Sequence, residues 1–95
     1  MKIKLRESFQ SRLLRQLEYI SRDNPTAARK FKNDVLNAIN SLPQRAWACR
    51  KSIYFDDEQI RDLIFKGYTI VFRISENTID VFGFVKYQQN PTDES

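Results

Sequence analysis

The most apolar stretch of the chain is residues 60–74, IRDLIFKGYTIVFRI. Strand-forming residues stand on both sides of Lys66-Gly67, and glycine permits the positive φ that a two-residue β-hairpin turn requires. The pattern therefore predicts two strands that fold back on one another. Four charged side chains are set into this hairpin: Arg61, Asp62, Lys66 and Arg73. They could belong to an active site, to a docking surface or to the solvated face of a sheet.

The residues before this hairpin predict one short strand and two helices. Lys2–Leu5 alternates charged and aliphatic residues, as a strand does. Ser8 can cap a helix that ends near Asp23, and Asn24-Pro25 is a strong signal for a second helix, which Pro43 ends. The apolar stripes of the two helices contain these residues: Phe9, Leu13, Leu17 and Ile20, then Ala27, Ala28, Phe31, Val35, Ile39 and Leu42.

Four further strands are predicted after the helices, over residues 51–55, 60–66, 68–74 and 78–87. The order is then β-α-α-β-β-β-β, an α+β fold in which the first strand and a helical hairpin pack on one face of a mainly antiparallel sheet. At 95 residues the chain forms a single domain, 1–95. The polar tail 88–95 is expected to be frayed.

Strand alternation places apolar side chains on both faces of this sheet. Tyr68, Ile70 and Phe72 share one face, and Val71 takes the other. In the last strand, Ile79, Val81 and Val85 oppose Phe82 and Phe84. Two helices can cover only one face, so we expect an apolar patch that marks a partner site, unless a loop such as that around Trp47 covers it.

Composition excludes several kinds of chemistry. The chain has no histidine and one cysteine, Cys49, so Ser-His-Asp and Cys-His catalysis and a zinc cluster are excluded. The only glycines are Gly67 and Gly83, and no phosphate-binding loop motif occurs. We expect no metal and no cofactor. The lone cysteine and the lack of a secretion signal or membrane span predict a cytoplasmic protein.

Charge is distributed unevenly along the chain. Residues 1–51 contain twelve Lys/Arg and four Asp/Glu, a net charge of +8, whereas residues 52–95 contain four and eight, a net charge of −4. A basic half can attract nucleic acid or an acidic protein, or it can simply keep two helices solvated.

In the order of its motifs the chain resembles the RelE/ParE superfamily of bacterial type II toxins. The resemblance rests on YISRDNPTAARKFKNDVLNAINSLP (19–43) and IRDLIFKGYTIVFRISENTIDVFGFVK (60–86). It implies a growth-inhibiting toxin, often with a role in plasmid stabilisation, that a cognate antitoxin neutralises. Operator DNA is then bound only indirectly, through the antitoxin. We expect the antitoxin to contact the basic helix and the open sheet face at Arg12, Arg15, Val71, Phe82 and Phe84.

The superfamily has two activities, which the residues help to separate. RelE-like toxins cleave mRNA on the ribosome with clustered Lys and Arg residues, whereas ParE-like toxins inhibit DNA gyrase by protein contact. Where positive charge would be needed, this chain has Asp62, Thr69 and Tyr87. The ParE-like branch is therefore favoured. The alternatives are an endoribonuclease with Arg61, Lys86 and Tyr87 as catalytic residues, or a non-toxic protein that acts only in antitoxin or operator complexes.

A target-binding set is predicted on the sheet, comprising Arg61, Lys66, Arg73, Lys86 and Tyr87. Arg61 is either a target contact or a structural partner of a nearby carboxylate. Trp47 could anchor a partner, but a core position between the hairpin and the sheet is favoured. Cys49 is interpreted as a small apolar filler.

Overall fold

The computed structural model describes residues 1–86. Its elements run β1 (Lys2–Leu5), α1 (Glu7–Asp23), α2 (Pro25–Asn40), α3 (Leu42–Arg45), the 3-10 turn η1 (Ala46–Ala48), β2 (Arg50–Lys51), β3 (Ile60–Phe65), β4 (Tyr68–Ile74) and β5 (Thr78–Lys86). The predicted α+β order is confirmed. Tyr87 and the predicted frayed tail lie outside the described residues.

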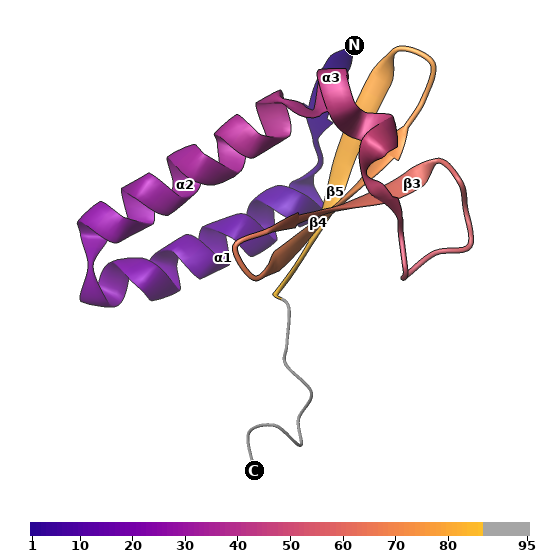
Figure 1. Cartoon of the computed structure of the whole chain (residues 1–95). Coiled ribbons are helices and arrows are strands. Elements are labelled where there is room, and N and C mark those ends of the chain that lie inside the picture. Colours follow the sequence, from indigo (N-terminus) through magenta and orange to yellow (C-terminus); the bar gives the residue numbers. More distant parts are fainter. Residues whose placement is uncertain (87–95) are drawn as a thin grey trace.

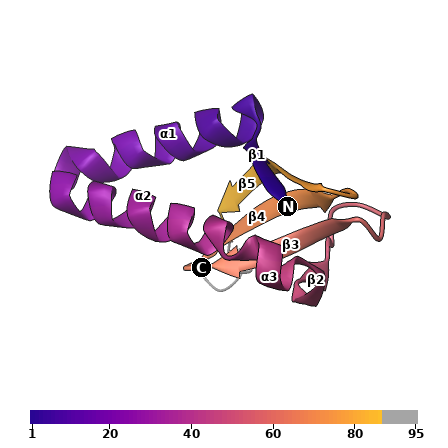
Figure 2. The same cartoon turned by 90° about the horizontal axis from the view of Figure 1, so that it is seen from above.

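The five strands form one mixed sheet in the order β1-β5-β4-β3-β2. β1 runs parallel to β5, and every other pair is antiparallel. The helices α1 and α2 form an antiparallel hairpin that packs on one face of the sheet, which we call the helix face (Figures 1 and 2). The core lies there, and Phe9, Val35 and Phe72 are completely buried in it.

Local chemistry explains how the helical hairpin turns. The Asn24 side chain accepts a hydrogen bond from the Ala27 N–H at 3.0 Å, and Pro25 opens α2, as predicted. The expectation that Ser8 caps α1 is wrong, because its hydroxyl donates instead to the Phe82 carbonyl at 2.7 Å. Pro43 does not end α2, which stops at Asn40; it lies in the first turn of α3, where no N–H is needed.

The predicted strand over residues 51–55 is also wrong, since β2 contains only Arg50 and Lys51. The Ser52 N–H still donates to the Ile60 carbonyl of β3 at 2.9 Å, but side chains accept from the next two backbone donors. The Ile53 N–H donates to the Asp62 carboxylate at 3.1 Å, and the Tyr54 N–H donates to the Ser52 hydroxyl at 3.2 Å. Local bonds of this type compete with a β-ladder. Residues 52–59 therefore form a loop.

The turn between β3 and β4 has the predicted geometry. Lys66 and Gly67 both have positive φ, 49° and 82°. Two such residues in succession form the turn whose twist matches that of a β-hairpin.

A β-bulge in β5 overturns the predicted division of faces. Val71 pairs with Gly83 but Phe72 pairs with Val81, so Phe82 is an extra residue. Beyond the bulge the alternation is reversed, and Phe84 joins Val81 in the core. The bulge also brings the strands close together, since a Cβ on Gly83 would lie 2.9 Å from the Val71 Cβ.

Candidate binding surface on the sheet

The face opposite the helices, which we call the loop face, is covered by the loop of residues 52–59. Phe55 of this loop packs edge-to-face on Phe82, with ring centroids 5.7 Å apart. Val71 and Thr69 are consequently buried. The expected apolar patch on the sheet is thus covered by a loop. The covering loop is residues 52–59, not the segment around Trp47. The loop itself remains apolar on its outside, where Ile53, Tyr54 and Phe55 are 67%, 47% and 43% exposed.

Three adjoining hollows run along the loop face, and we call them together the trough. Phe55 and Phe82 line both the first hollow and the middle hollow, whereas Tyr54 and Val85 line both the middle hollow and the last. Their volumes are about 370, 370 and 640 Å³. Aromatic side chains of the loop and of β5 therefore separate compartments of one elongated surface.

Most of the predicted antitoxin contacts meet at the middle hollow. Arg12, Val71, Phe82 and Phe84 line it, and Arg15 does not. Phe84 forms only its floor, because it faces the core, 5.7 Å from the Phe9 ring and stacked on Tyr68 at 4.9 Å. Its predicted place on the face away from the helices is therefore wrong, because the bulge at Phe82 reverses the alternation of side chains beyond it.

Carboxylates neutralise most of the cations around the trough. Three guanidinium groups form ion pairs: Arg6 with Asp80 at 2.9 Å, Arg50 with Asp62 at 3.1 Å and Arg73 with Asp57 at 3.3 Å. Among residues 1–86, no carboxylate pairs with Arg12 or Lys86. The unpaired positive charge of the trough thus lies at its α1 side and at the end of β5.

Asp62 is a structural residue of the loop face. Its side chain is fully buried, and Oδ2 accepts hydrogen bonds from Arg50 Nε at 3.2 Å and from the Ile53 N–H at 3.1 Å. Oδ1 has no hydrogen-bond partner among the described residues. Asp62 therefore fastens the loop to β3. From the sequence, Asp62 was expected only to repel phosphate, and no local pattern indicated Arg50 as its partner.

Arg61, the neighbour of Asp62, points to the helix face. It donates to three backbone carbonyls, those of Glu58 at 2.9 Å, Cys49 at 3.0 Å and Trp47 at 3.3 Å. A weaker ion pair joins it to Glu58 at 3.7 Å, and only 15% of its side chain is exposed. Arg61 thus holds η1 and the loop in place, and it is the most enclosed of the four described members of the predicted target set.

The other predicted target residues do not converge. Lys66, at the tip of the β3–β4 turn, donates to Asp34 of α2 at 2.7 Å. This bond, with a second from Lys30, lowers the pKa of Asp34 below its usual value of 3.8. Arg73 lies at the opposite end of β4, about 20 Å away at 3.3 Å per residue. Lys86 is exposed beside Tyr68, and Tyr87 lies beyond the described residues.

The favoured core position for Trp47 is wrong. Its side chain is 56% exposed and lies over the Arg61 guanidinium, 4.9 Å from the ring centroid. Cys49 is partly buried against the core, as expected of an apolar filler. Burial raises the pKa of its thiol, which keeps the thiol neutral and unreactive at pH 7.

Residues 3–91 match the family model described as "ParE toxin of type II toxin-antitoxin system, parDE". The chain belongs to this ParE toxin family. Among solved structures it is similar to a "Chromosomal ParDE TA system from P. aeruginosa", with a TM-score of 0.76 and 18% identity over 93% of this chain and 97% of that one. At that identity the likeness shows a shared fold. No curated protein sequence matches the chain.

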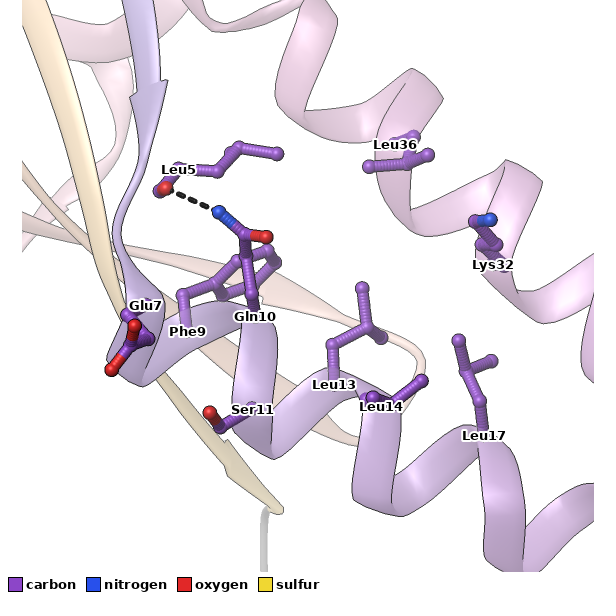
Figure 3. A pocket seen from close by; sticks show the side chains of 10 residues that line it. All are labelled: Leu5, Glu7, Phe9, Gln10, Ser11, Leu13, Leu14, Leu17, Lys32 and Leu36. Carbon is purple, nitrogen blue, oxygen red and sulfur yellow. Dashed lines mark hydrogen bonds between the residues drawn. The ribbon is translucent and has the colours of Figure 1, made fainter.

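Apart from the trough, a further hollow of this ParE-family chain lies between α1 and α2 (Figure 3). It has a volume of about 430 Å³ and is lined mainly by leucines, with Lys32 on its α2 side. Leu14 is 59% exposed there, and Gln10 closes one end by donating to the Leu5 carbonyl at 2.7 Å. This groove was not predicted from the sequence, because Leu14 lies beside the core stripe of α1. The Leu13-Leu14 pair was the available signal.

The described part of this ParE-family toxin contains no helix long and apolar enough to cross a membrane. It also brings no three side chains of His, Cys, Asp or Glu together as metal ligands would be.

Proposed function

We propose that this ParE-family toxin inhibits DNA gyrase by direct protein contact and that a cognate antitoxin neutralises it. Membership of the family supports the antitoxin. The choice of gyrase over mRNA cleavage rests on one observation, the state of the charges on the loop face.

Cleavage of RNA by a metal-free protein needs clustered cations at the scissile phosphate and a group that carries a proton. On the loop face three guanidinium groups are already paired with Asp80, Asp62 and Asp57. The remaining cations, Arg12 and Lys86, lie on different elements, and among residues 1–86 no carboxylate pairs with either; the titratable side chain that lines the hollows of both is Tyr54. This arrangement supports binding in preference to catalysis.

The trough has the character of a protein-binding surface. Its aromatic side chains, Tyr54, Phe55 and Phe82, are partly exposed, and such residues supply most of the binding energy of protein interfaces. Five residues remain candidates for the gyrase contact: Arg61, Lys66, Arg73, Lys86 and Tyr87. Of these, Arg61 would act by holding Trp47 in its exposed position.

A gyrase supercoiling assay run beside an in vitro translation assay tests the proposal with the same purified toxin. We expect loss of supercoiling with accumulation of cleaved DNA, no effect on translation, and reversal by an equimolar amount of antitoxin. Arrest of translation with intact supercoiling would instead establish the endoribonuclease. If neither assay responds, the protein is a non-toxic member of the family.

Alanine variants of the candidate residues locate the contact. We expect Arg73→Ala or Lys86→Ala to weaken gyrase inhibition, whereas Arg29→Ala, an exposed arginine of α2 outside the candidate set, serves as the matched control. Equal inhibition by all three variants would exclude the loop face as the gyrase contact.

A further inference from the structure

One side of α1 carries a row of arginines. Arg12, Arg15, Tyr19 and Arg22 follow one another at spacings of three, four and three residues, and all four side chains are exposed. Residues at these spacings lie on one side of a helix. At roughly 1.5 Å of rise per residue, Arg12 and Arg22 stand about 15 Å apart along the helix axis. We call these four residues the arginine stripe.

Contacts with the sheet fix the direction in which the stripe faces. One turn before Arg12, the Ser8 hydroxyl donates to the Phe82 carbonyl of β5 at 2.7 Å, and Arg12 itself lines the middle hollow beside β5. Further along α1, Tyr19 lies near Tyr68 of β4, because the pKa of Tyr68 is raised first by burial and then by Tyr19. The stripe therefore borders the sheet and not α2 (Figure 1).

The acidic residues of α1 lie apart from the stripe. Glu7 lines the groove between α1 and α2, Glu18 lines a hollow beside α2, and Asp23 is the last residue of the helix. Among residues 1–86, no carboxylate pairs with any of the three arginines. A helix face that is merely solvated commonly alternates the signs of its charges. Here positive and negative charge are separated, so the stripe presents three guanidinium groups together.

The residue types of the stripe suit the phosphates of DNA. Arginine binds phosphate through its planar fork, and tyrosine hydroxyls also donate to phosphate oxygens in protein–DNA complexes. Each DNA strand carries one phosphate about every 3.4 Å along the axis, so the length of the stripe spans about four phosphates. DNA offers this regular array through its covalent structure, whereas an acidic peptide would have to order its carboxylates to match it. The stripe therefore fits DNA better than it fits an acidic protein.

We propose that the arginine stripe binds the phosphate backbone of double-stranded DNA, without regard to sequence, and holds the toxin on the DNA that gyrase is cleaving. The three arginines pair with phosphates along one strand, and the Tyr19 hydroxyl donates to a phosphate between them. Binding of DNA by the toxin alone is independent of the proposed function; its role beside gyrase rests on that function.

Fluorescence anisotropy of a labelled duplex of about 20 base pairs tests the stripe with the purified toxin alone. Three phosphate contacts predict a slope of about −2.7 in a plot of log affinity against log salt concentration. Arg15→Gln keeps a good helix former and loses one contact. The slope should therefore become shallower by about 0.9, and the affinity at about 0.1 M salt should fall roughly fivefold to tenfold. Arg29→Gln, an exposed position of α2 outside the stripe, is the matched control and should keep the wild-type slope.

The tail of the chain supplies two further carboxylates, Asp93 and Glu94, which lie outside the described residues. The same measurements on an Asp93→Asn, Glu94→Gln variant show whether the tail competes with DNA for the stripe. We expect this variant to bind DNA at least as tightly as the wild type and to lose the same amount of slope on Arg15→Gln. A slope that does not depend on Arg15 in this variant would overturn the inference.

Poly-glutamate at matched charge concentration separates DNA from an acidic protein partner. If Arg15→Gln weakens binding of poly-glutamate but not of DNA, the stripe is a site for an acidic protein and the inference is wrong. Equal DNA-binding slopes for the wild type, Arg15→Gln and Arg29→Gln would also overturn it, as would a wild-type toxin that does not bind DNA.

The supercoiling assay separates this inference from the proposed function. If both are correct, Arg15→Gln should raise the toxin concentration for half-inhibition of gyrase by roughly fivefold to tenfold, and Arg29→Gln should not. DNA binding through the stripe without inhibition of supercoiling would overturn the proposed function and leave the DNA site intact. Inhibition of supercoiling by a toxin whose DNA binding ignores the stripe would overturn the DNA site alone.

Discussion

Arg61 and Asp62 are neighbours in β3 with opposite charges, and each fastens an irregular segment to a different face of the sheet. Arg61 donates to carbonyl groups of η1 and of the loop on the helix face, whereas Asp62 accepts the Ile53 N–H and pairs with Arg50 on the loop face. The Arg61 side chain keeps some contact with solvent, but that of Asp62 has none. On each face a charged side chain of β3 therefore holds an irregular segment through hydrogen bonds to its backbone. We expect the segment on the loop face to depend more on Asp62 than the segment on the helix face depends on Arg61.

The largest effect is expected from Asp62→Ala. Its removal leaves the Ile53 N–H without its acceptor and Arg50 without its ion partner, a loss of about 2–3 kcal/mol. Arg50 is half exposed and regains water, which keeps the loss below that for a fully buried pair. Urea denaturation followed by circular dichroism measures it. Asp62→Asn keeps an acceptor for Ile53 and should lose less; an equal loss would show that the charge, not the loop contact, matters.

Arg61→Ala is expected to cost about 1–2 kcal/mol, less than Asp62→Ala, because the carbonyl groups that it releases lie near solvent. Arg61→Lys is the informative control, since it keeps the charge but cannot hold the carbonyls of Trp47 and Cys49 at once. If the lysine variant is as stable as the wild type, Arg61 stabilises the fold by charge alone. A greater loss of stability for Arg61→Ala than for Asp62→Ala would show that the fold depends more on the contacts of Arg61 than on those of Asp62.

A smaller effect is expected from Phe55→Ala, which removes the aromatic cover of Phe82. An edge-to-face pair contributes about 0.5–1.5 kcal/mol, and the exposed part of the Phe55 ring adds little. Stability should fall by less than for Asp62→Ala, while exchange of the Val71 amide becomes faster because the loop opens more often. Unchanged exchange at Val71 would mean that Asp62 alone keeps the loop closed.

The smallest effect concerns the helix face, where Lys66 joins the tip of the β3–β4 hairpin to Asp34 of α2. The pKa of Asp34 is lowered on folding, chiefly by the bond from Lys66, so the pair stabilises the fold above pH 3.8 and the contribution disappears as pH falls through the lowered value. Asp34→Asn should therefore lower the urea midpoint slightly at pH 7 and not at all in strong acid. A difference that persists in acid would contradict this origin.

The sequence reveals some features of this fold and not others. Helical stripes, the Asn24 cap and the Lys66-Gly67 turn are local features, and each predicted its element correctly because neighbouring residues decide it. The bulge at Phe82 depends on how β5 meets β4, and a single extra residue there moved Phe84 to the other face. The loop of residues 52–59 depends on Asp62, which follows it in sequence. Because the Asp62 carboxylate accepts the Ile53 N–H, the segment forms a loop over the sheet and not a strand.

The candidate site was predictable to a similar degree. Arg12, Val71 and Phe82 were placed in one antitoxin set and do line one hollow, because charge and apolar character can be read residue by residue. The ion pairs that neutralise Arg6, Arg50 and Arg73 join residues far apart in the chain, and no local pattern announces them. For the same reason Arg61 could not be assigned to a structural or a contact role.

The position of Trp47 has a consequence for spectroscopy. It is the single tryptophan of the chain, it is more than half exposed, and its ring rests on the guanidinium of Arg61. Its fluorescence therefore reports on the attachment of η1 to Arg61, not on the core around Phe72. A fluorescence transition that precedes the loss of helical circular dichroism would record this segment detaching before the sheet unfolds.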